Sequence, residues 1–263
     1  MQENEARTTS PADDLKLILE AAREAGEIAL SYYRRDPEVW FKEGNSPVSA
    51  ADLAVDRFLR DKLLAARPDY GWLSEETADQ PDRLKAQRTF VVDPIDGTRA
   101  FIGGKDIWCV SIAVVENGRT IAGVLDCPAR REVFTAAAGQ GAFANGSAIA
   151  VRPQGGELRI AGAKAMINRL PGELLQGVQI PSHIPSLAYR IAMVARGELD
   201  ATFVKRYSHD WDLAAADLIL SEAGGLLLDA GGQRPYLGGS DPEKGPLAAG
   251  SGELLRIMTG TLG

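Results

Sequence analysis

The sequence predicts a protein of mixed helices and strands, with an α+β first half built on an antiparallel meander and an α/β second half. Three observations predict this. Apolar, β-branched runs at 107–115, 120–125 and 133–138 lie close together, and Asn117-Gly118 between the first two is a strong hairpin-turn signal. Two earlier stretches carry apolar residues at the 3.6-residue spacing of helices. Beyond residue 153, strand-like and helix-like segments alternate, which is typical of α/β structure.

Length and composition exclude several classes of protein. The 263 residues allow one large domain or two closely packed halves. With 45% apolar and 25% charged residues the chain resembles an ordinary soluble globule, and a net charge of −7 argues against a nucleic-acid polymer as partner. Only Cys109 and Cys127 are cysteines, which excludes a disulfide scaffold or a thiolate zinc site. Since no apolar run approaches the length of a membrane span, we predict a cytoplasmic protein with no membrane partner.

We expect three parts along the chain. Residues 1–12 are polar and predict a flexible tail. Residues 13–152 form the N-terminal α+β half and carry most of the candidate metal ligands. Residues 153–263 form the C-terminal α/β half, which completes the site. The boundary falls at Pro153-Gln154-Gly155-Gly156, where the composition shifts.

Caps, periodicity and turn residues predict the individual elements. In the first half we expect helices from Asp13 to about 35, from Ser49 to about 63 and from 98 to 103, and extended segments at 40–42 and 70–73 besides the meander. In the second half we expect strands at 158–161, 178–180, 201–204 and 226–228, and helices after Asn168, from Pro185 to 197 and over 211–223. The glycines at 139, 141 and 146 predict turns and lack the context of a dinucleotide site.

The chain is organised around residues 90–98, where a buried apolar strand ends on Asp93 and a proline turn leads to Asp96. Acids at the carboxyl end of a strand are placed where α/β proteins carry out chemistry. Together with the carbonyl oxygen of Ile95 they form a set of hard oxygen ligands that suits Mg²⁺ rather than zinc or copper. The alternative is a strand followed by an ordinary Asp-rich turn.

The residues that follow suit a phosphate. Gly97 and Thr98 offer backbone N–H groups at the start of a turn, where a phosphate oxygen binds readily. The Thr98 hydroxyl could also orient a water molecule.

Two further carboxylates are candidate metal ligands. Glu75 and Glu76 follow the strand-like run 70–73, and since adjacent side chains of an extended chain point to opposite sides, we expect only Glu75 to bind metal. Asp212 lies in the first turn of the predicted helix 211–223. Each has an alternative: a solvated acidic turn for Glu75, and a favourable interaction with the helix dipole for Asp212.

Asp52 also has two interpretations. Ser49-x-x-Asp52 is close to a capping box, in which the acid would only stabilise the start of its helix. Alternatively, Asp52 reaches a reacting water molecule.

Four segments together resemble the inositol monophosphatase family, whose members are Mg²⁺-dependent, lithium-sensitive phosphatases. Asp93-Pro94-Ile95-Asp96-Gly97-Thr98 resembles its central motif, and Ser74-Glu75-Glu76 resembles its upstream Gly-Glu-Glu element. Pro47 to Asp52 resembles its N-terminal element, and Trp211 to Ala216 with Glu222 to Gly225 resembles its C-terminal motif. The resemblance implies a layered αβαβα sandwich of the sugar-phosphatase type and a homodimer.

The resemblance also implies an arrangement of two to three Mg²⁺ ions. One ion would be held by Glu75, Asp93 and the Ile95 carbonyl, a second by Asp93, Asp96 and Asp212, and a weaker third would lie near Glu75 through water. The family's catalytic roles fall on Asp52, Thr98 and Glu75, with Asp52 and Thr98 activating the attacking water. Gly97 and Thr98 would hold the phosphate. No residue pattern indicates a covalent phosphoenzyme.

The substrate-binding positions depart from the inositol-specific pattern. Where relatives that bind inositol carry a glutamate, this chain has Lys205-Arg206, which suits a substrate with a second anionic group. The alternative is that Lys205 is a solvated strand end. The family's Gly-Ser element is replaced by Pro185-Ser186, which leaves Ser186 as a candidate substrate ligand.

Among small phosphorylated metabolites, these residues resemble most the pattern of the 3'(2'),5'-bisphosphate nucleotidases, whose substrate is 3'-phosphoadenosine 5'-phosphate. Inositol-1-monophosphatase remains an alternative, and inositol phosphate is an expected side activity. Residues 98–102 and Trp108 also resemble the histidinol-phosphatase branch. A hypothesis of another class is a regulatory binding protein with a secondary site.

Overall fold

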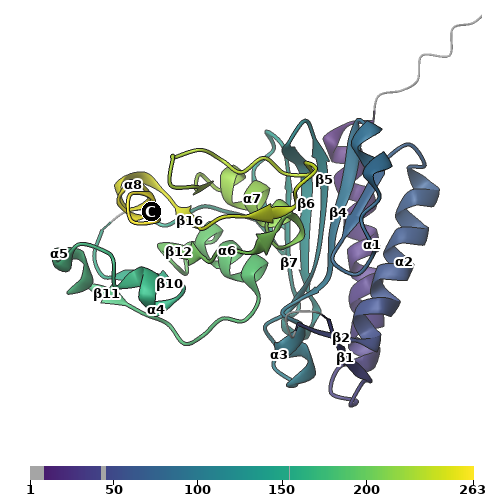
Figure 1. Cartoon of the computed structure of the whole chain (residues 1–263), viewed down its shortest axis with the longest axis horizontal. Helices are drawn as coiled ribbons and strands as arrows, with labels where there is room; N and C mark the ends of the chain where they lie inside the picture. Colours follow the sequence, from purple (N-terminus) through teal and green to yellow (C-terminus); the bar gives the residue numbers. More distant parts are fainter. Residues whose placement is uncertain (1–8, 43–45, 154) are drawn as a thin grey trace, which may run out of the picture.

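Five layers make up the computed structural model, which describes residues 9–42, 46–153 and 155–263. Figure 1 shows their order from right to left: helices α1 and α2, a large sheet, helices α6 and α7, a second sheet, and the small helices around α8. This is the αβαβα sandwich that the resemblance implied. The layering follows from the sequence, because each sheet buries two apolar faces and needs a helical layer on either side.

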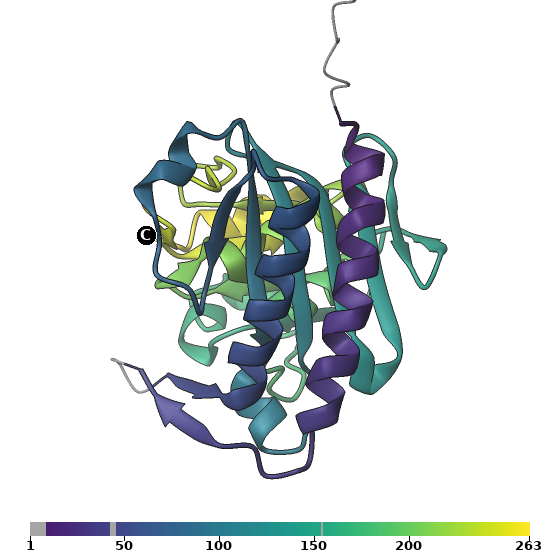
Figure 2. The same ribbon diagram turned by 90° about the vertical axis from the view of Figure 1, so that its right-hand side faces the viewer.

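The outer layer consists of α1 (Pro11–Tyr32) and α2 (Ala50–Ala66). The helix α1 begins earlier than predicted because Ser10 caps it: Ser10 Oγ accepts from the Asp13 N–H at 3.2 Å, and Asp13 Oδ2 accepts from the Ser10 N–H at 3.1 Å. The predicted tail 1–12 is therefore wrong at its last two residues, while residues 1–8 lie outside the described part of the chain. Figure 2 shows both helices lying along the strands of the large sheet.

The large sheet has seven strands in the order β3-β4-β5-β6-β7-β8-β9. Their bounds are β3 Gly71–Ser74, β4 Arg88–Asp96, β5 Cys109–Glu116, β6 Arg119–Cys127, β7 Glu132–Ala137, β8 Ala142–Ala144 and β9 Ser147–Ile149. β3 and β4 are parallel, and every other pair is antiparallel, as the predicted meander requires. Asn117 (φ 50°) and Gly118 (φ 74°) form the predicted turn between β5 and β6. For the segment that forms the hairpin β8–β9, the sequence predicted turns at the glycines but no strands.

The second sheet has five strands in the order β11-β10-β12-β16-β14. Their bounds are β10 Leu158–Ala161, β11 Val178–Gln179, β12 Ala201–Val204, β14 Leu226–Leu228 and β16 Leu247–Gly250. β10 pairs in parallel with β11 and β12, whereas β16 is antiparallel to both of its neighbours. The sequence did not predict β16, the central member between β12 and β14.

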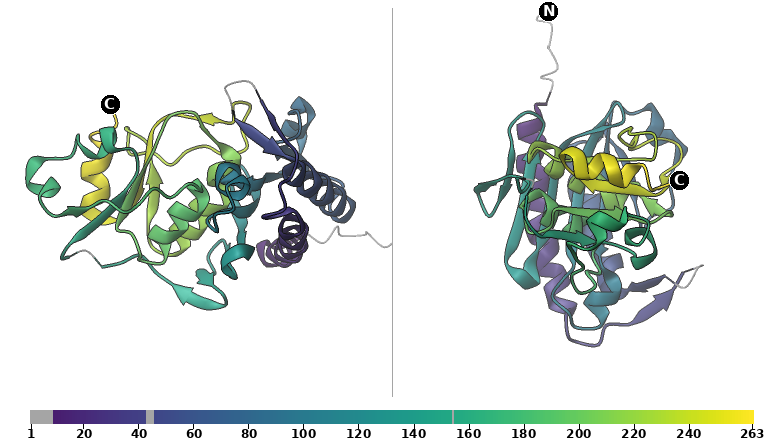
Figure 3. Two further views of the ribbon diagram at one scale, coloured as in Figure 1. Left: turned by 90° about the horizontal axis from the view of Figure 1, so that it is seen from below. Right: turned by 90° about the vertical axis from the view of Figure 1, so that its left-hand side faces the viewer.

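Smaller elements complete the chain. They are β1 Val39–Phe41 with β2 Pro47–Ser49, β13 Ser208–His209 with β15 Glu243–Lys244, the short helices α3 Thr98–Ile102, α4 Lys164–Ile167 and α5 Gly172–Leu175, α8 Gly252–Thr259, and 3₁₀ turns at Pro81–Lys85 and Pro128–Arg130. The helix predicted after Asn168 is present as the single turn α5, whose N-cap is Pro171, while α4, which ends just before Asn168, was not predicted. Figure 3 shows α8 packed on the outer face of the second sheet.

The central layer consists of α6 (Leu187–Ala195) and α7 (Asp210–Glu222), packed between the two sheets. The helix α7 lies close to strand β6 because Gly123 of β6 has no side chain. A Cβ at Gly123 would lie 3.1 Å from the Cα and from the carbonyl oxygen of Ala215 in α7. Thr120 Oγ1 also donates to the Ala214 carbonyl at 2.9 Å. The second turn of α7 is thereby packed closely against the large sheet, which carries the central acidic motif.

In the part of the chain that the structure describes, the helices are either too short or too polar to cross a bilayer.

Candidate active site

Three carboxylates converge between the large sheet and α7. One oxygen each from Asp93, Asp96 and Asp212 lies within 4.8 Å of the others. Asp93 and Asp96 are at the carboxyl end of β4, and Asp212 is in the first turn of α7, more than a hundred residues later. Three hard oxygen donors at this spacing fit a Mg²⁺ ion.

The pairing of β4 with β5 is irregular between Asp93 and Asp96, the two acids of β4 in the cluster. Asp93 pairs with Ser111 and Asp96 with Cys109, so the register shifts between them. The Ile95 N–H donates to Asp93 Oδ1 at 3.0 Å, and the Ile95 carbonyl oxygen lies 3.0 Å from Thr98 Oγ1. The chain then turns at Gly97, whose φ of +98° suits glycine and whose Cβ would lie 3.3 Å from that of Ser186.

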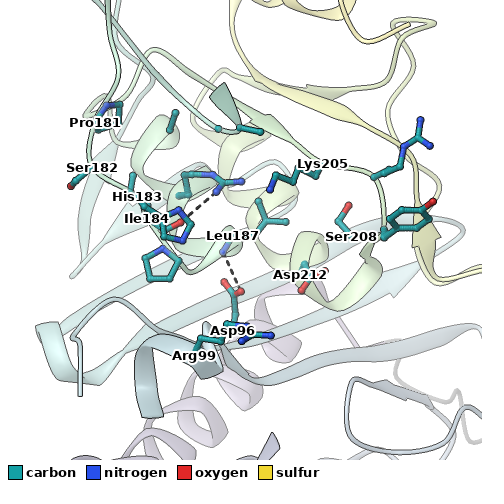
Figure 4. A pocket seen from close by; sticks show the side chains of 17 residues that line it. Asp96, Arg99, Pro181, Ser182, His183, Ile184, Leu187, Lys205, Ser208 and Asp212 are labelled. Atoms are coloured by element: carbon teal, nitrogen blue, oxygen red, sulfur yellow. Dashed lines mark hydrogen bonds between the residues drawn. The ribbon is translucent and has the colours of Figure 1, made fainter. Parts of the chain in front are cut away.

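Asp96 is held by the N-terminus of α6. Asp96 Oδ2 accepts from the Ala188 N–H at 2.7 Å and from Ser186 Oγ, and Asp96 Oδ1 accepts from the Leu187 N–H at 3.1 Å, which is drawn in Figure 4. Ser186 is fully buried and also caps α6. The expectation that Ser186 binds substrate is therefore corrected: its hydroxyl positions Asp96.

Asp212 caps its own helix and faces the other acids. Its Oδ2 accepts from the His209 N–H at 2.7 Å, so the structural interpretation of this residue holds. The same carboxyl still contributes an oxygen to the cluster with Asp93 and Asp96. Asp212 therefore both caps α7 and contributes to the carboxylate cluster.

Glu75 lies beside the cluster, outside the group of oxygens within 4.8 Å. The chain bends after β3, so Glu75 and Glu76 both reach Lys42: Lys42 Nζ lies 3.1 Å from Glu75 Oε1 and 2.7 Å from Glu76 Oε1. The expectation that the two glutamates point to opposite sides was wrong, because it assumed an extended chain. Lys42 was not predicted as a site residue, since no motif or spacing marks it in the sequence.

The cluster is electrostatically unfavourable without a cation. Burial raises the pKa of Asp93 well above its usual range, and the charge of Glu75 and then of Asp96 adds to the effect. Burial likewise raises the pKa of Asp212 well above its usual value, with Asp96 as the next cause. Buried carboxylates that repel each other are typical of a site that binds a divalent cation.

Asp52 links the start of α2 to Thr98. Its Oδ2 accepts from the Ser49 N–H at 2.8 Å, and its Oδ1 accepts from Thr98 Oγ1 at 3.2 Å. Thr98 Oγ1 also lies 3.0 Å from the Ile95 carbonyl oxygen. Burial raises the pKa of Asp52 to about 6. The residue completes a capping box and is also placed to accept a proton near neutral pH.

A cavity of about 590 Å³ opens above Asp96 and Asp212. In Figure 4 the segment from Pro181 to Ile184 forms one side, and Lys205 and Ser208 lie on the other. Four cationic residues line it: Arg99, Arg190, Lys205 and Arg206. The cavity therefore combines a carboxylate floor with walls that favour anions.

Arg190 was not recognised from the sequence, because its helical spacing made it one more residue of α6. Its guanidinium is bonded to the carbonyl oxygens of Phe203 at 3.3 Å and Ile184 at 3.4 Å, yet its Nε has no partner among the described residues. Burial lowers its pKa, and Asp96 opposes this.

Two residues of the histidinol-phosphatase resemblance belong to the core. Trp108 and Phe101 are almost completely buried and pack edge to face, with ring centres 4.9 Å apart. Neither lines the cavity. Of that group of residues, Arg99 does.

The sequence profile of the inositol monophosphatase family matches residues 11–259, which is nearly the whole chain. The chain belongs to the inositol monophosphatase family. Among curated relatives, it is 33% identical to the histidinol-phosphatase of Chlorobaculum parvum (86% of this chain, 89% of the relative) and 31% identical to the 3'(2'),5'-bisphosphate nucleotidase CysQ of Aggregatibacter actinomycetemcomitans (82% and 84%). It is also 34% identical to the Nus factor SuhB of Pasteurella multocida (85% and 87%).

Solved structures of this family have the same fold. The extragenic suppressor protein suhB of Bartonella henselae superposes with a TM-score of 0.83 at 28% identity, covering 95% of this chain and 98% of that one. The Thermotoga maritima IMPase gives 0.82 at 27% identity, covering 95% and 96%. As a member of the inositol monophosphatase family, the protein is a phosphoric monoester hydrolase of the Mg²⁺-dependent type.

Proposed function

We propose that this phosphatase hydrolyses a small phosphate monoester that carries a second anionic group, with 3'-phosphoadenosine 5'-phosphate as the first candidate. The observation that carries the proposal is the set of cations around the cavity, above all the exposed Lys205 across from Asp96. The resemblance to a bisphosphate nucleotidase at 31% identity supports it.

Asp93, Asp96 and Asp212 would hold Mg²⁺, with Glu75 and the Ile95 carbonyl completing the ligands. The number of ions, two to three, stays a prediction. When bound, the metal supplies positive charge that activates water and stabilises the leaving oxygen. Because the acids come from β4 and α7, both halves of the chain are needed for this site.

Asp52 and Thr98 would prepare the attacking water. Thr98 Oγ1 donates to Asp52 Oδ1, so the hydroxyl oxygen keeps lone pairs that can accept from a water molecule. As the water oxygen bonds to phosphorus and the ester P–O bond breaks, its proton passes through Thr98 to Asp52. The departing alcohol takes a proton from solvent. The N–H groups of Gly97 and Thr98 would hold a phosphate oxygen.

The cationic side chains that line the cavity would discriminate between the alternative substrates. Histidinol phosphate carries an ammonium group, which Lys205, Arg190 and Arg99 would repel. Inositol 1-phosphate is neutral apart from its phosphate, so it gains nothing from these cations and is proposed as a slower side substrate. A second phosphate gains one charge-assisted hydrogen bond for each cation that it reaches.

The test compares kcat/KM for 3'-phosphoadenosine 5'-phosphate, inositol 1-phosphate and histidinol phosphate with Mg²⁺ present. We expect a preference of about tenfold or more for the bisphosphate, because a hydrogen bond to a charged group contributes about 1.5–3 kcal/mol. Lys205→Glu should remove that preference, while Lys16→Glu, a charge reversal at an exposed position of α1, should leave it unchanged. A wild-type preference for inositol 1-phosphate would disprove the proposal.

A regulatory binding role is the candidate of a different class. It is favoured by the 34% identity to a Nus factor. The convergence of Asp93, Asp96 and Asp212 and the contact between Asp52 and Thr98 favour catalysis instead. Failure to hydrolyse all three substrates, although Mg²⁺ is bound, would favour the regulatory role.

A further inference from the structure

Tyr207 adopts a left-handed backbone conformation that is uncommon for a residue with a large side chain. Its φ is +67°, in the left-handed region that costs energy for residues other than glycine, and the residue is 65% exposed. The conformation is held by the Tyr207 N–H, which donates to the Lys244 carbonyl at 3.0 Å, and by the adjoining ladder between β13 and β15. Backbone strain of this kind is concentrated at active sites and ligand-binding sites, so its position in the lining of the cavity supports a functional role for Tyr207.

Ser208, the next residue, carries a buried hydroxyl without a partner. The residue is 6% exposed, and its Oγ makes no hydrogen bond to any other described residue. Figure 4 shows it lining the cavity on the same side as Lys205 and Asp212. Because buried polar atoms are nearly always bonded in native proteins, this hydroxyl is available for a ligand.

The other large rings near the site are less available for stacking. His209 and Trp211 are stacked on each other with ring centres 4.5 Å apart, so each has one face covered. Among the described residues that line the cavity, Tyr207 is the only one with a benzene or indole ring. The Arg206 guanidinium lies 5.9 Å from its ring centre, which places a cation beside the ring.

We propose that Tyr207 and Ser208 form a nucleoside subsite, in which the tyrosine ring stacks on an aromatic base and the serine hydroxyl binds a ribose hydroxyl. The subsite rests on the proposed function, because it assigns the part of a nucleotide substrate that carries no phosphate. Lys205 and Arg206 precede it in the chain and line the same cavity, so phosphate and nucleoside contacts come from one continuous segment.

The test for Tyr207 compares 3'-phosphoadenosine 5'-phosphate with ribose 3,5-bisphosphate, which lacks the base. Tyr207→Ala should lower kcat/KM for the adenosine substrate about tenfold, mainly through KM, and leave the ribose substrate unchanged. Tyr207→Phe should retain the wild-type value. Tyr207→Gly, which relieves the left-handed strain, should match the alanine variant and guards against misfolding.

The matched control is Tyr236→Ala. Tyr236 is 64% exposed and does not line this cavity, so its removal should alter neither substrate. An equal loss on both substrates in Tyr207→Ala would assign the tyrosine a structural role, and no loss on either would exclude stacking. Both results would overturn the subsite.

Ser208→Ala should lower kcat/KM about fivefold for both ribose-containing substrates and leave 4-nitrophenyl phosphate, which has no hydroxyl, unchanged. If the hydroxyl contacts no substrate, the variant should keep full activity and melt at a higher temperature, because an unpaired buried group has been removed.

Failure of the subsite can be distinguished from failure of the proposed function by adding adenosine 3'-monophosphate. Equal kcat/KM for this substrate and the bisphosphate would contradict the second-anion proposal. The effect of Tyr207→Ala on the monophosphate would still report on base stacking.

Discussion

At the scale of single residues, Asp93 is a buried carboxylate that other carboxylates of the site repel. It is buried, and its pKa is raised well above the usual range by burial and by Glu75 and Asp96. Asp93→Asn should lower kcat by roughly a hundredfold or more, since a metal ligand is lost. It should also raise the melting temperature of the metal-free protein, because one repelling buried charge has been removed.

Calorimetry with and without Mg²⁺ checks this prediction. Each kcal/mol added to the free energy of unfolding should raise the melting temperature by about 2–4 °C in a protein of this size. In the variant, Mg²⁺ should raise the melting temperature less than in the wild type. A metal-free variant that melts below the wild type would show that Asp93 stabilises the fold by itself.

Asp52 gives a pH prediction. Its pKa is raised to about 6 by burial, so the folded protein binds its proton more tightly than the unfolded chain does, and this contribution to stability is lost as pH rises from about 4 to 6. For catalysis the ionised form is needed. We therefore expect kcat/KM to fall as pH drops through about 6, or somewhat lower once bound cations favour the carboxylate.

Asp52→Asn should remove this acidic limb from the pH profile and lower kcat/KM about a hundredfold at pH 7.5. Ser49→Ala serves as a comparison: it keeps the contact between Asp52 and Thr98 but removes the Ser49 Oγ donor to Asp52 Oδ2, so the acidic limb should persist and move to higher pH. A limb that persists in Asp52→Asn would assign the titration to another group.

Several residues show how far the sequence alone could go. Asp93, Ile95, Asp96, Gly97 and Thr98 are adjacent in the chain, so their local motif was sufficient to group them. The role of Ser186 was mistaken because its partner, Asp96, lies ninety residues away. Lys42 and Arg190 went unrecognised for the same reason: nothing in their neighbouring residues indicates the carboxylates and the cavity that they meet.

At the scale of elements, the approach of β6 to α7 decides where Asp212 lies. Gly123→Ala would bring a methyl group within 3.1 Å of backbone atoms of Ala215, which cannot rotate away. We expect it to destabilise the protein by about 1–3 kcal/mol in urea unfolding and to raise the Mg²⁺ concentration needed for half-maximal rate, because α7 must shift.

Gly172→Ala is the matched control. A Cβ at Gly172 would have no neighbour within 4 Å, so the substitution should be close to neutral or slightly stabilising. If Gly123→Ala destabilises the fold without changing the Mg²⁺ requirement, the packing of α7 does not control the metal ligands.

Local chemistry explains which elements were predictable. The caps at Ser49 and Ser186 and the turn at Asn117-Gly118 are signals contained within a few residues, and the elements they mark were found. β16 was missed because Leu247–Gly250 is short and rich in alanine and glycine, and it is a strand only because β12 and β14 pair with it. The layered sandwich came from the family resemblance, since periodicity does not order layers.

At the scale of the whole molecule, the site joins the two halves of the chain. Asp93 and Asp96 belong to the large sheet, while Asp212, Lys205 and Ser208 come from the second half. A ligand that binds only the folded protein stabilises it by mass action. At a hundredfold excess over its dissociation constant, Mg²⁺ should therefore add about 2.7 kcal/mol to the free energy of unfolding.

Titration of the melting temperature with Mg²⁺ measures this effect, and Asp212→Asn should reduce it. The predicted homodimer is checked on the same samples by light scattering after gel filtration, with and without Mg²⁺. A single mass of about 28 kDa would contradict the homodimer.

The most direct test of the account is the initial rate of phosphate release from 3'-phosphoadenosine 5'-phosphate as Mg²⁺ is added to protein first treated with chelator. We predict no release without the divalent ion, a saturable rise with it, and a rate at least about a hundredfold lower for Asp212→Asn. Release that is independent of Mg²⁺, or equal in Asp212→Asn, would contradict a metal-dependent site built from both halves of the chain.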